Sequence, residues 1–378
     1  MADQEWTSQK RLWAAYNLEV PDRVPIWMLF PREKTGAYVD VYNLPTYRRV
    51  MPHIVEKTDW LVFKGLGRPM FFSGATQIDS EVEETEKWTV TRQILHTPKG
   101  DLVAESRSRK DEASGARTKH FCEEPEDLEK VLSIPYEPVD PDVGPYHQAA
   151  KDLGEDGFMM VGTNVPVDIL YKVVHPEKLA LWTLTERDLI LEFCQTMFER
   201  QYTFLKKGLD EGAGPIFHFV GTELIAPPLC SPATFDALVT PFSAPIFEMI
   251  HDYGCKVHVH HHGNIKGVIE IIADMGADGI HPIEEPPIGD CTLAEAKALV
   301  GDRVCLIGSV QWDDFARLEP EEMEALVKRQ IRDAAPEGGH ILSPSCGPYQ
   351  SHLSERQQEN LVRFIDAGRK WGDYPLSF

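Results

Sequence analysis

The chain has 378 residues and a formal net charge of −22 at pH 7, with 42% hydrophobic and 26% charged residues. These fractions are typical of a globular protein, and a surface this acidic argues against nucleic acid and anionic membranes as partners. Residues 1–17 lack the apolar segment and cleavage site of a signal peptide, and no run of about 18 apolar residues occurs. The seven cysteines have no disulfide-framework spacing. We therefore expect a cytoplasmic protein with reduced thiols and no membrane segment.

Short apolar or β-branched runs, typical of buried strands, alternate along the chain with longer amphipathic stretches that predict helices. The predicted strands are 24–30, 60–66, 158–164, 215–221, 256–262, 278–284, 304–310 and 340–346. Strands that alternate with helices pair in parallel, and eight such units predict a (β/α)8 TIM barrel. An open doubly wound sheet is the alternative, but no Gly-rich phosphate-binding motif follows an early strand.

One segment departs from this alternation. Residues 80–110 alternate polar and apolar side chains around a Pro-Lys-Gly-Asp turn, which predicts an antiparallel β-hairpin inserted after the second strand. No linker, repeat or low-complexity tract interrupts the chain. We therefore expect an α/β protein in which residues 1–378 form a single TIM barrel with an inserted hairpin.

Polar side chains end several predicted strands, which is where α/β barrels carry their active sites. The fifth strand ends in a His-rich run, and strand alternation puts His260 and His262 on one face, about 6–7 Å apart. Cys346 ends the eighth strand and Glu223 follows the fourth. Two imidazoles, a thiolate and a carboxylate suit zinc better than magnesium or calcium. The spacing alone leaves open a solvated His-rich patch or a set of hydrogen-bonded core imidazoles.

Other polar residues near the predicted rim allow less specific interpretations. Glu223, Glu285 and Gln311 are the candidate catalytic groups, although Glu284 and Glu285 equally fit a solvated loop pair. We assign no role to the two remaining histidines of the run, which we expect in the core and against the helix layer: His258 and His261.

The segments HVHHHGNIKGVIEIIADMGADGIHPIEE, GDRVCLIGSVQW and GGHILSPSCGP resemble the uroporphyrinogen decarboxylase superfamily, from about residue 215 to the end. The resemblance implies the same (β/α)8 barrel. The true decarboxylases carry Arg-Gln-Ala-Gly-Arg after the first strand, an Asp after the second and a His on the last. Here those positions read Leu29-Phe30-Pro31-Arg32-Glu33, Phe63-Lys64-Gly65 and Cys346. Both N-terminal signatures are missing, so the resemblance does not imply porphyrinogen decarboxylation.

The chain is more similar to the cobalamin-dependent methyltransferase branch, whose zinc motif is His-x-Cys on the fifth strand with a distant Cys. His260 and Cys346 match this motif, His262 replaces the middle Cys, and Glu223 falls where an acidic ligand is expected. The resemblance implies Zn²⁺, a small-molecule methyl donor, and a corrinoid carried by a separate protein, because no Asp-x-His-x-x-Gly cobalamin signature occurs. It also implies a homodimer.

Imidazole in place of thiolate leaves zinc more Lewis-acidic, which favours demethylation of a methyl ether over methylation of a thiol. Three alternatives stay open. A decarboxylase acting on another polycarboxylate would use rim arginines, of which Arg32 is the only obvious one. A zinc hydrolase or lyase would use Glu223 or Glu285 as base, and a catalytically silent binding protein would leave the site unused.

Overall fold

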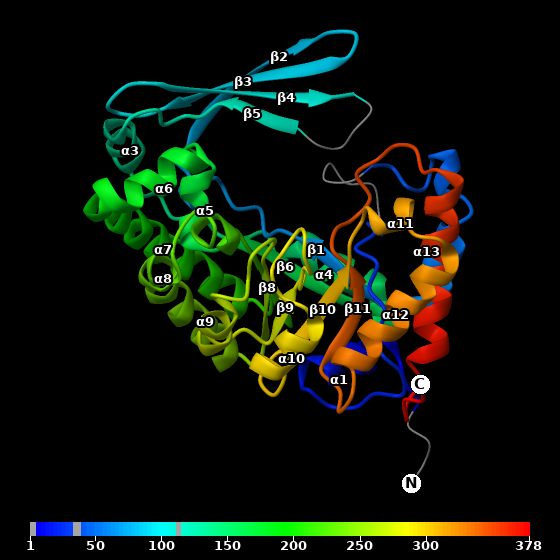
Figure 1. The fold of residues 1–378 in the computed structure, drawn as a ribbon. Coiled ribbons are helices and arrows are strands. Elements are labelled where there is room, and N and C mark those ends of the chain that lie inside the picture. The colour runs from blue at the N-terminus through cyan, green and yellow to red at the C-terminus, as the bar shows by residue number, and fades with distance from the viewer. Residues whose placement is uncertain (1–4, 33–38, 111–114) are drawn as a thin grey trace.

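The computed structural model describes residues 5–32, 39–110 and 115–378, so Glu33 of the run quoted above lies outside it. Seven parallel strands form one curled sheet in the order β1-β6-β7-β8-β9-β10-β11 (Figure 1). The strands are β1 Trp60–Lys64, β6 Gly157–Asn164, β7 Ile216–Val220, β8 Lys256–His260, β9 Gly279–His281, β10 Cys305–Val310 and β11 His340–Pro344. Each lies within one of the predicted strands or starts one residue before it.

The predicted first strand, 24–30, is not a regular strand in the structure, so the sheet has seven strands where the sequence predicts eight. Ile26 makes an isolated parallel bridge with Leu342 of β11. The Leu342 N–H donates to the Pro25 carbonyl, and the Asp59 N–H, just before β1, donates to the Ile26 carbonyl. Pro25 has no N–H to add to a ladder, and Leu29 has a left-handed φ of 54°. The segment therefore bonds to the two edges of the sheet through a few hydrogen bonds and does not form a strand of its own.

Asp59 fixes this segment to the sheet. Its buried carboxylate accepts hydrogen bonds from Arg11 Nη1 at 2.9 Å, from Arg23 Nη1 and Nη2 at 2.8 and 3.0 Å, and from the Ile26 N–H at 2.9 Å. Arg11 belongs to α1 (Ser8–Tyr16), so one carboxylate joins a helix, the N-terminal segment and the start of β1. Pairing offsets part of the desolvation cost of these buried charges.

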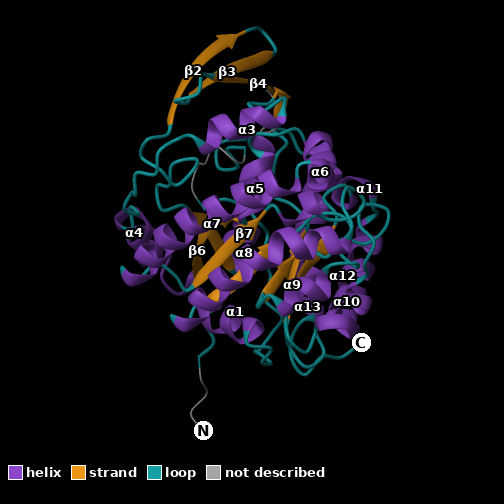
Figure 2. Ribbon diagram, turned by 90° about the vertical axis from the view of Figure 1, so that its left-hand side faces the viewer, coloured by secondary structure: helices purple, strands orange, loops and turns teal. Residues whose placement is uncertain are grey.

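Helices surround the parallel sheet (Figure 2). Besides α1, they are α2 Met51–Lys57, α3 Pro125–Leu132, α4 Gly144–Leu153, α5 Pro166–Tyr171, α6 Pro176–Thr185, α7 Arg187–Asp210, α8 Pro232–Asp252, α9 Ile269–Asp274, α10 Leu293–Val300, α11 Asp314–Arg317, α12 Pro320–Ala334 and α13 Glu355–Trp371. The described part of the chain also has three short 3-10 helices, η1 Pro45–Tyr47, η2 Gly154–Asp156 and η3 Thr222–Ile225. Two apolar clusters form the core, a large one that includes the sheet–helix interface and a smaller one around Tyr16 and Trp27. Within the described residues, no helix is long and apolar enough to cross a membrane.

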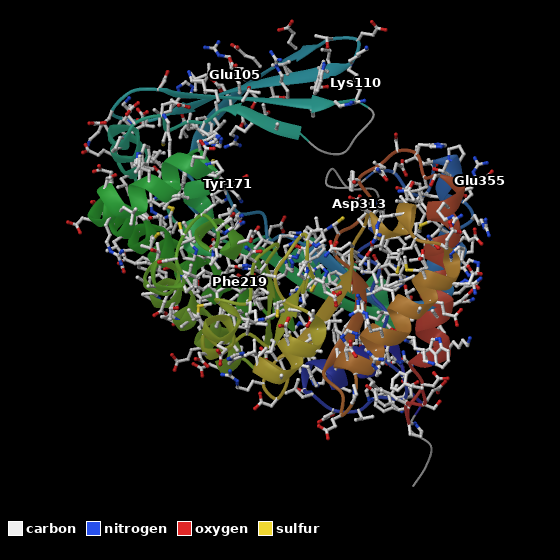
Figure 3. The ribbon with its side chains drawn as sticks, in the orientation of Figure 1. Glu105, Lys110, Tyr171, Phe219, Asp313 and Glu355 are labelled. Carbon is white, nitrogen blue, oxygen red and sulfur yellow. The ribbon has the colours of Figure 1, made fainter. Side chains whose placement is uncertain are left out.

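A second sheet is inserted between β1 and α3. Its four antiparallel strands are β2 Gln77–Glu84, β3 Trp88–His96, β4 Leu102–Arg109 and β5 Gly115–Lys119. The segment predicted as a hairpin, 80–110, is thus part of a larger sheet, in which β3 and β4 flank the predicted Pro-Lys-Gly-Asp turn. The sheet projects from the body in both views, and Figure 3 shows Glu105 and Lys110 on it, away from Phe219 of β7. The Cys122 N–H, which donates to the Val173 carbonyl at 2.8 Å, ties its end to the segment after α5.

Candidate active site

Four imidazoles share the inner face of three neighbouring strands. In the parallel register, His258 of β8 pairs with His218 of β7, and His260 of β8 pairs with His281 of β9. The His260 ring centroid lies 5.5 Å from that of His218 and 5.1 Å from that of His281. The sequence predicts a role for His260 but not for His218 or His281. Alternation along the predicted strands 215–221 and 278–284 was the signal that could have found them.

The hydrogen bonds of His260 and His281 determine which ring nitrogen of His260 can bind a ligand. Burial lowers the pKa of His281 to about 3, and burial together with His281 holds the pKa of His260 well below its ordinary value, so both rings are neutral at pH 7. His281 Nε2 lies 3.0 Å from the Pro344 carbonyl, which only accepts, so this nitrogen donates. His281 Nδ1 must then accept from His260 Nδ1, 3.0 Å away. His260 is left with an unprotonated Nε2, the form that binds metals.

His262 is held in the same way by a carboxylate. Its Nδ1 lies 3.2 Å from Oε2 of Glu284, which also accepts the Gly263 N–H at 2.7 Å. Burial raises the pKa of Glu284, but the hydrogen bonds from His262 and Gly263 outweigh burial and hold it below its ordinary value. The ionised carboxylate only accepts, so Nδ1 donates and Nε2 points elsewhere. The His260 and His262 ring centroids are 4.6 Å apart.

Glu223 lies in η3, directly after β7. Gly221 precedes it with a φ of +97°, and a Cβ at Gly221 would collide with Asp168, so the turn that places Glu223 requires glycine. The Oε2 atom of Glu223 is buried without a hydrogen-bond partner. Burial raises the pKa of Glu223 to about 7, while the positive charge of His262 acts in the opposite direction. A buried carboxylate oxygen without a partner can accept a hydrogen bond or bind a proton.

Cys346 follows β11 and is half-buried. Burial, followed by the negative charge of Glu284, raises the pKa of the Cys346 thiol to about 12, so the thiol is protonated at neutral pH. Throughout residues 5–32, 39–110 and 115–378, no three His, Cys, Asp or Glu side chains converge as a group that could hold a metal ion. The predicted ligands His260, His262, Cys346 and Glu223 do not form such a group among these residues. The rings of His260 and His262 are in contact, and the charge of His262 acts on Glu223.

The structure does not bring two predicted catalytic residues to the histidines. Glu285 accepts two hydrogen bonds from Arg329 of α12, at 2.9 and 2.8 Å, so its carboxylate is already paired. Gln311 lines a separate cavity of about 390 Å³ together with Glu285 and Arg329. Glu284, to which the sequence gives no preference, is the carboxylate beside His262.

The other two histidines of the run have structural partners. His258 is fully buried, and its Nδ1 lies 2.6 Å from the Tyr16 hydroxyl. His261 is buried, and its Nδ1 lies 3.0 Å from the Thr222 hydroxyl. Their placement in the interior agrees with giving neither a role in the site.

A cavity of about 450 Å³ opens beside the histidines, within the usual range of roughly 300–1,000 Å³ for small-molecule sites. His218 and His260 form part of its wall. The other lining residues are Leu29, Phe30, Pro31, Arg32, Leu61, Val62, Phe63, Arg68, Gly162, Thr163, Asn164 and Val220. The wall is thus mostly apolar and aromatic, with a few polar groups.

Comparisons with known proteins agree with this architecture. Residues 109–371 match the family model described as uroporphyrinogen decarboxylase (URO-D). A methylcobamide:CoM methyltransferase, MtaA, of Methanosarcina barkeri is 25% identical over 201 residues, 52% of this chain and 55% of the relative. The chain therefore matches only about half the length of that curated relative.

A solved structure, a methyltransferase from Methanosarcina mazei, superposes with a TM-score of 0.61 at 16% identity. It covers 97% of this chain and 99% of that one, which shows a shared fold. The family model matches well over half of the chain, which confirms the resemblance drawn from the C-terminal segments. The chain belongs to the uroporphyrinogen decarboxylase (URO-D) family.

Proposed function

We propose that the protein is a corrinoid-dependent methyltransferase of the O-demethylase type. It would move a methyl group from a small methyl ether to the Co(I) of a separate corrinoid protein. The observation that carries the proposal is the pair His260 and His262, each bonded through Nδ1 so that Nε2 remains for a ligand, with His260 at the wall of a cavity. The URO-D family and the name of the Methanosarcina barkeri relative support the same reaction class.

The residues of the site fit zinc in their chemistry. His260, His262, Cys346 and Glu223 offer two imidazoles, a thiol that loses its proton on metal binding, and a carboxylate oxygen without a partner. When bound there, zinc would supply a Lewis acid that draws charge from the ether oxygen of the substrate.

The chain's own residues position the substrate. His281 and Glu284 fix the rings of His260 and His262 through their Nδ1 atoms. The apolar walls of the cavity exclude water from the reacting end of the substrate. Glu223, with a pKa of about 7, can hold or release a proton near neutral pH beside His262.

Glu285 and Gln311 have no part in this proposal, because they line the other cavity. The single domain over 1–378, the cytoplasmic location and the homodimer remain predictions from the sequence.

A methyl-transfer assay tests the proposal. Zinc-loaded protein is incubated with a methoxylated aromatic compound and Co(I) cobalamin, and both the loss of Co(I) absorbance and the release of the phenol are followed. We expect the phenol to appear only when Co(I) is present, in a one-to-one ratio with methylated cobalt. Phenol release without cobalamin would instead indicate a zinc hydrolase or lyase, and release of CO₂ would indicate a decarboxylase.

A further inference from the structure

Arg68 lies in the connection between β1 and β2 and lines the 450 Å³ cavity that His260 also lines. Its guanidinium lies over the Phe72 ring, 5.1 Å from the centroid, and Nη2 donates to Oδ1 of Asn164. Arg32, the rim arginine named from the sequence, lines the same cavity but is paired with Asp156 at 2.8 Å. Arg68 thus donates its hydrogen bond to a neutral amide, whereas Arg32 is paired with a carboxylate.

The surroundings of Arg68 hold more positive than negative charge. Lys172 donates to the same amide oxygen of Asn164, at 3.0 Å. The carboxylate in contact with these groups is Asp168, whose Oδ2 lies 3.5 Å from Lys172 Nζ and also accepts from Asn164 Nδ2. Besides burial, two nearby charges act on the pKa of Glu223 in opposite directions: His262 lowers it and Asp168 raises it. Two cations thus share one neutral oxygen and one carboxylate.

A half-buried guanidinium in such a place is stabilised by an added carboxylate. A planar carboxylate accepts two hydrogen bonds from a guanidinium, which gives both affinity and a fixed orientation. Phe30 and Phe63 add aromatic side chains to the wall of the cavity. A flat molecule with a carboxylate at one end and a methoxy group at the other would use the guanidinium, the aromatic walls and the histidine end together.

We propose that the substrate is a methoxylated aromatic carboxylate and that Arg68 binds its carboxylate. The methyl-transfer part of this statement rests on the proposed function, whereas binding of the carboxylate by Arg68 does not. Arg68 is a binding and orienting residue here, and the methoxy group lies towards His260.

Binding is measured by calorimetry without any corrinoid, using 4-methoxybenzoate and its uncharged analogue 4-methoxybenzamide as probes. We expect the wild type to bind the carboxylate roughly 10- to 100-fold more tightly than the amide, the range of a charge-assisted hydrogen bond. Arg68→Gln should lose this preference and keep its affinity for the amide, which also shows that the cavity is intact. Arg68→Lys should keep part of the preference, since the charge remains without the planar fork.

Arg303→Gln is the matched control. It removes the same charge, but Arg303 pairs with Asp274 and precedes β10, at the end of the sheet opposite to the cavity. Its binding of both probes should equal that of the wild type. Equal binding of the two probes by the wild type, no binding of either, or the same loss in Arg303→Gln would overturn the inference.

The two proposals fail separately. Arg68-dependent binding of 4-methoxybenzoate with no corrinoid-linked demethylation would leave this inference standing and remove the proposed function. Corrinoid-linked demethylation of the acid and the amide at equal rates would support the proposed function and remove the inference about Arg68.

Discussion

Glu284 and Glu285 are neighbours in the chain but face different parts of the molecule, and this difference can be measured. Removing a carboxylate that binds the second ring nitrogen of a metal-ligating histidine typically weakens metal binding by about 10- to 100-fold. We expect Glu284→Gln to weaken zinc binding by that factor, because His262 Nδ1 loses its charged acceptor. Competition with a chelator gives the affinity, and His262→Ala should abolish it.

Glu285→Gln serves as the control, since it makes the same chemical change one residue away and affects the pair with Arg329. Its zinc affinity should match the wild type. An equal or larger loss in Glu285→Gln would mean that the carboxylate beside His262 does not orient a ligand.

Strand alternation predicted that His260 and His262 lie together, and their rings are in contact although β8 ends at His260. Alternation could not choose between Glu284 and Glu285. The predicted strand 278–284 is regular only over Gly279–His281, and after it the chain turns through Pro282, so the alternation that would orient the glutamates has ended. Arg68 was missed for a similar reason. It lies beyond the end of β1 in a segment without regular structure, where no periodicity indicates which way a side chain points.

At the scale of elements, Asp278 lies just before β9 and connects it to α8 and β8. Its carboxylate lies 2.8 Å from His251 Nε2 in α8, accepts from Lys256 Nζ at 2.9 Å, and accepts the Val257 N–H of β8 at 2.7 Å. Burial raises the pKa of Asp278, but these hydrogen bonds outweigh burial and hold it below the ordinary value. A lowered pKa contributes stability that is present at neutral pH and is lost as the pH falls through the folded-state pKa.

We therefore expect Asp278→Asn to reduce the free energy of unfolding by about 1–3 kcal/mol at pH 7. The difference from the wild type should stay constant from about pH 8 to 5 and narrow only below about pH 4, where the unfolded carboxyl also binds a proton. Urea unfolding at several pH values measures this. Asp140→Asn is the control, because its pair with Lys207 is exposed and should contribute less than about 1 kcal/mol. A difference that grew on acidification would contradict the assigned sign.

The seven strands of the parallel sheet were predictable because each is a short apolar run between amphipathic helices, and burial imposes that pattern. The segment 24–30 has the same composition, yet Pro25 and Leu29 prevent a regular ladder. The four-stranded sheet was only partly predictable. Nearly all of β2 is exposed, so no apolar face is needed there and its sequence resembles a polar loop.

At the scale of the whole molecule, two electrostatic effects oppose each other. The net charge of −22 makes the folded chain repel itself, while many surface ion pairs attract. Exposed pairs contribute only about 0–1 kcal/mol each and are short-ranged. The repulsion extends over the Debye length, which falls from about 30 Å at 10 mM salt to about 8 Å at 150 mM. Salt should therefore weaken the repulsion more than the attraction.

We expect the Tm to rise by roughly 1–2 °C between 10 and 150 mM NaCl at pH 7.5, which corresponds to about 1 kcal/mol for a chain of 378 residues. The double variant Glu56→Lys and Glu248→Lys, at two exposed positions, reduces the net negative charge and should show a smaller rise. Differential scanning calorimetry of both proteins over the salt series provides the comparison. A Tm that falls with added salt would show that the ion pairs, rather than the net charge, dominate the electrostatic part of the stability.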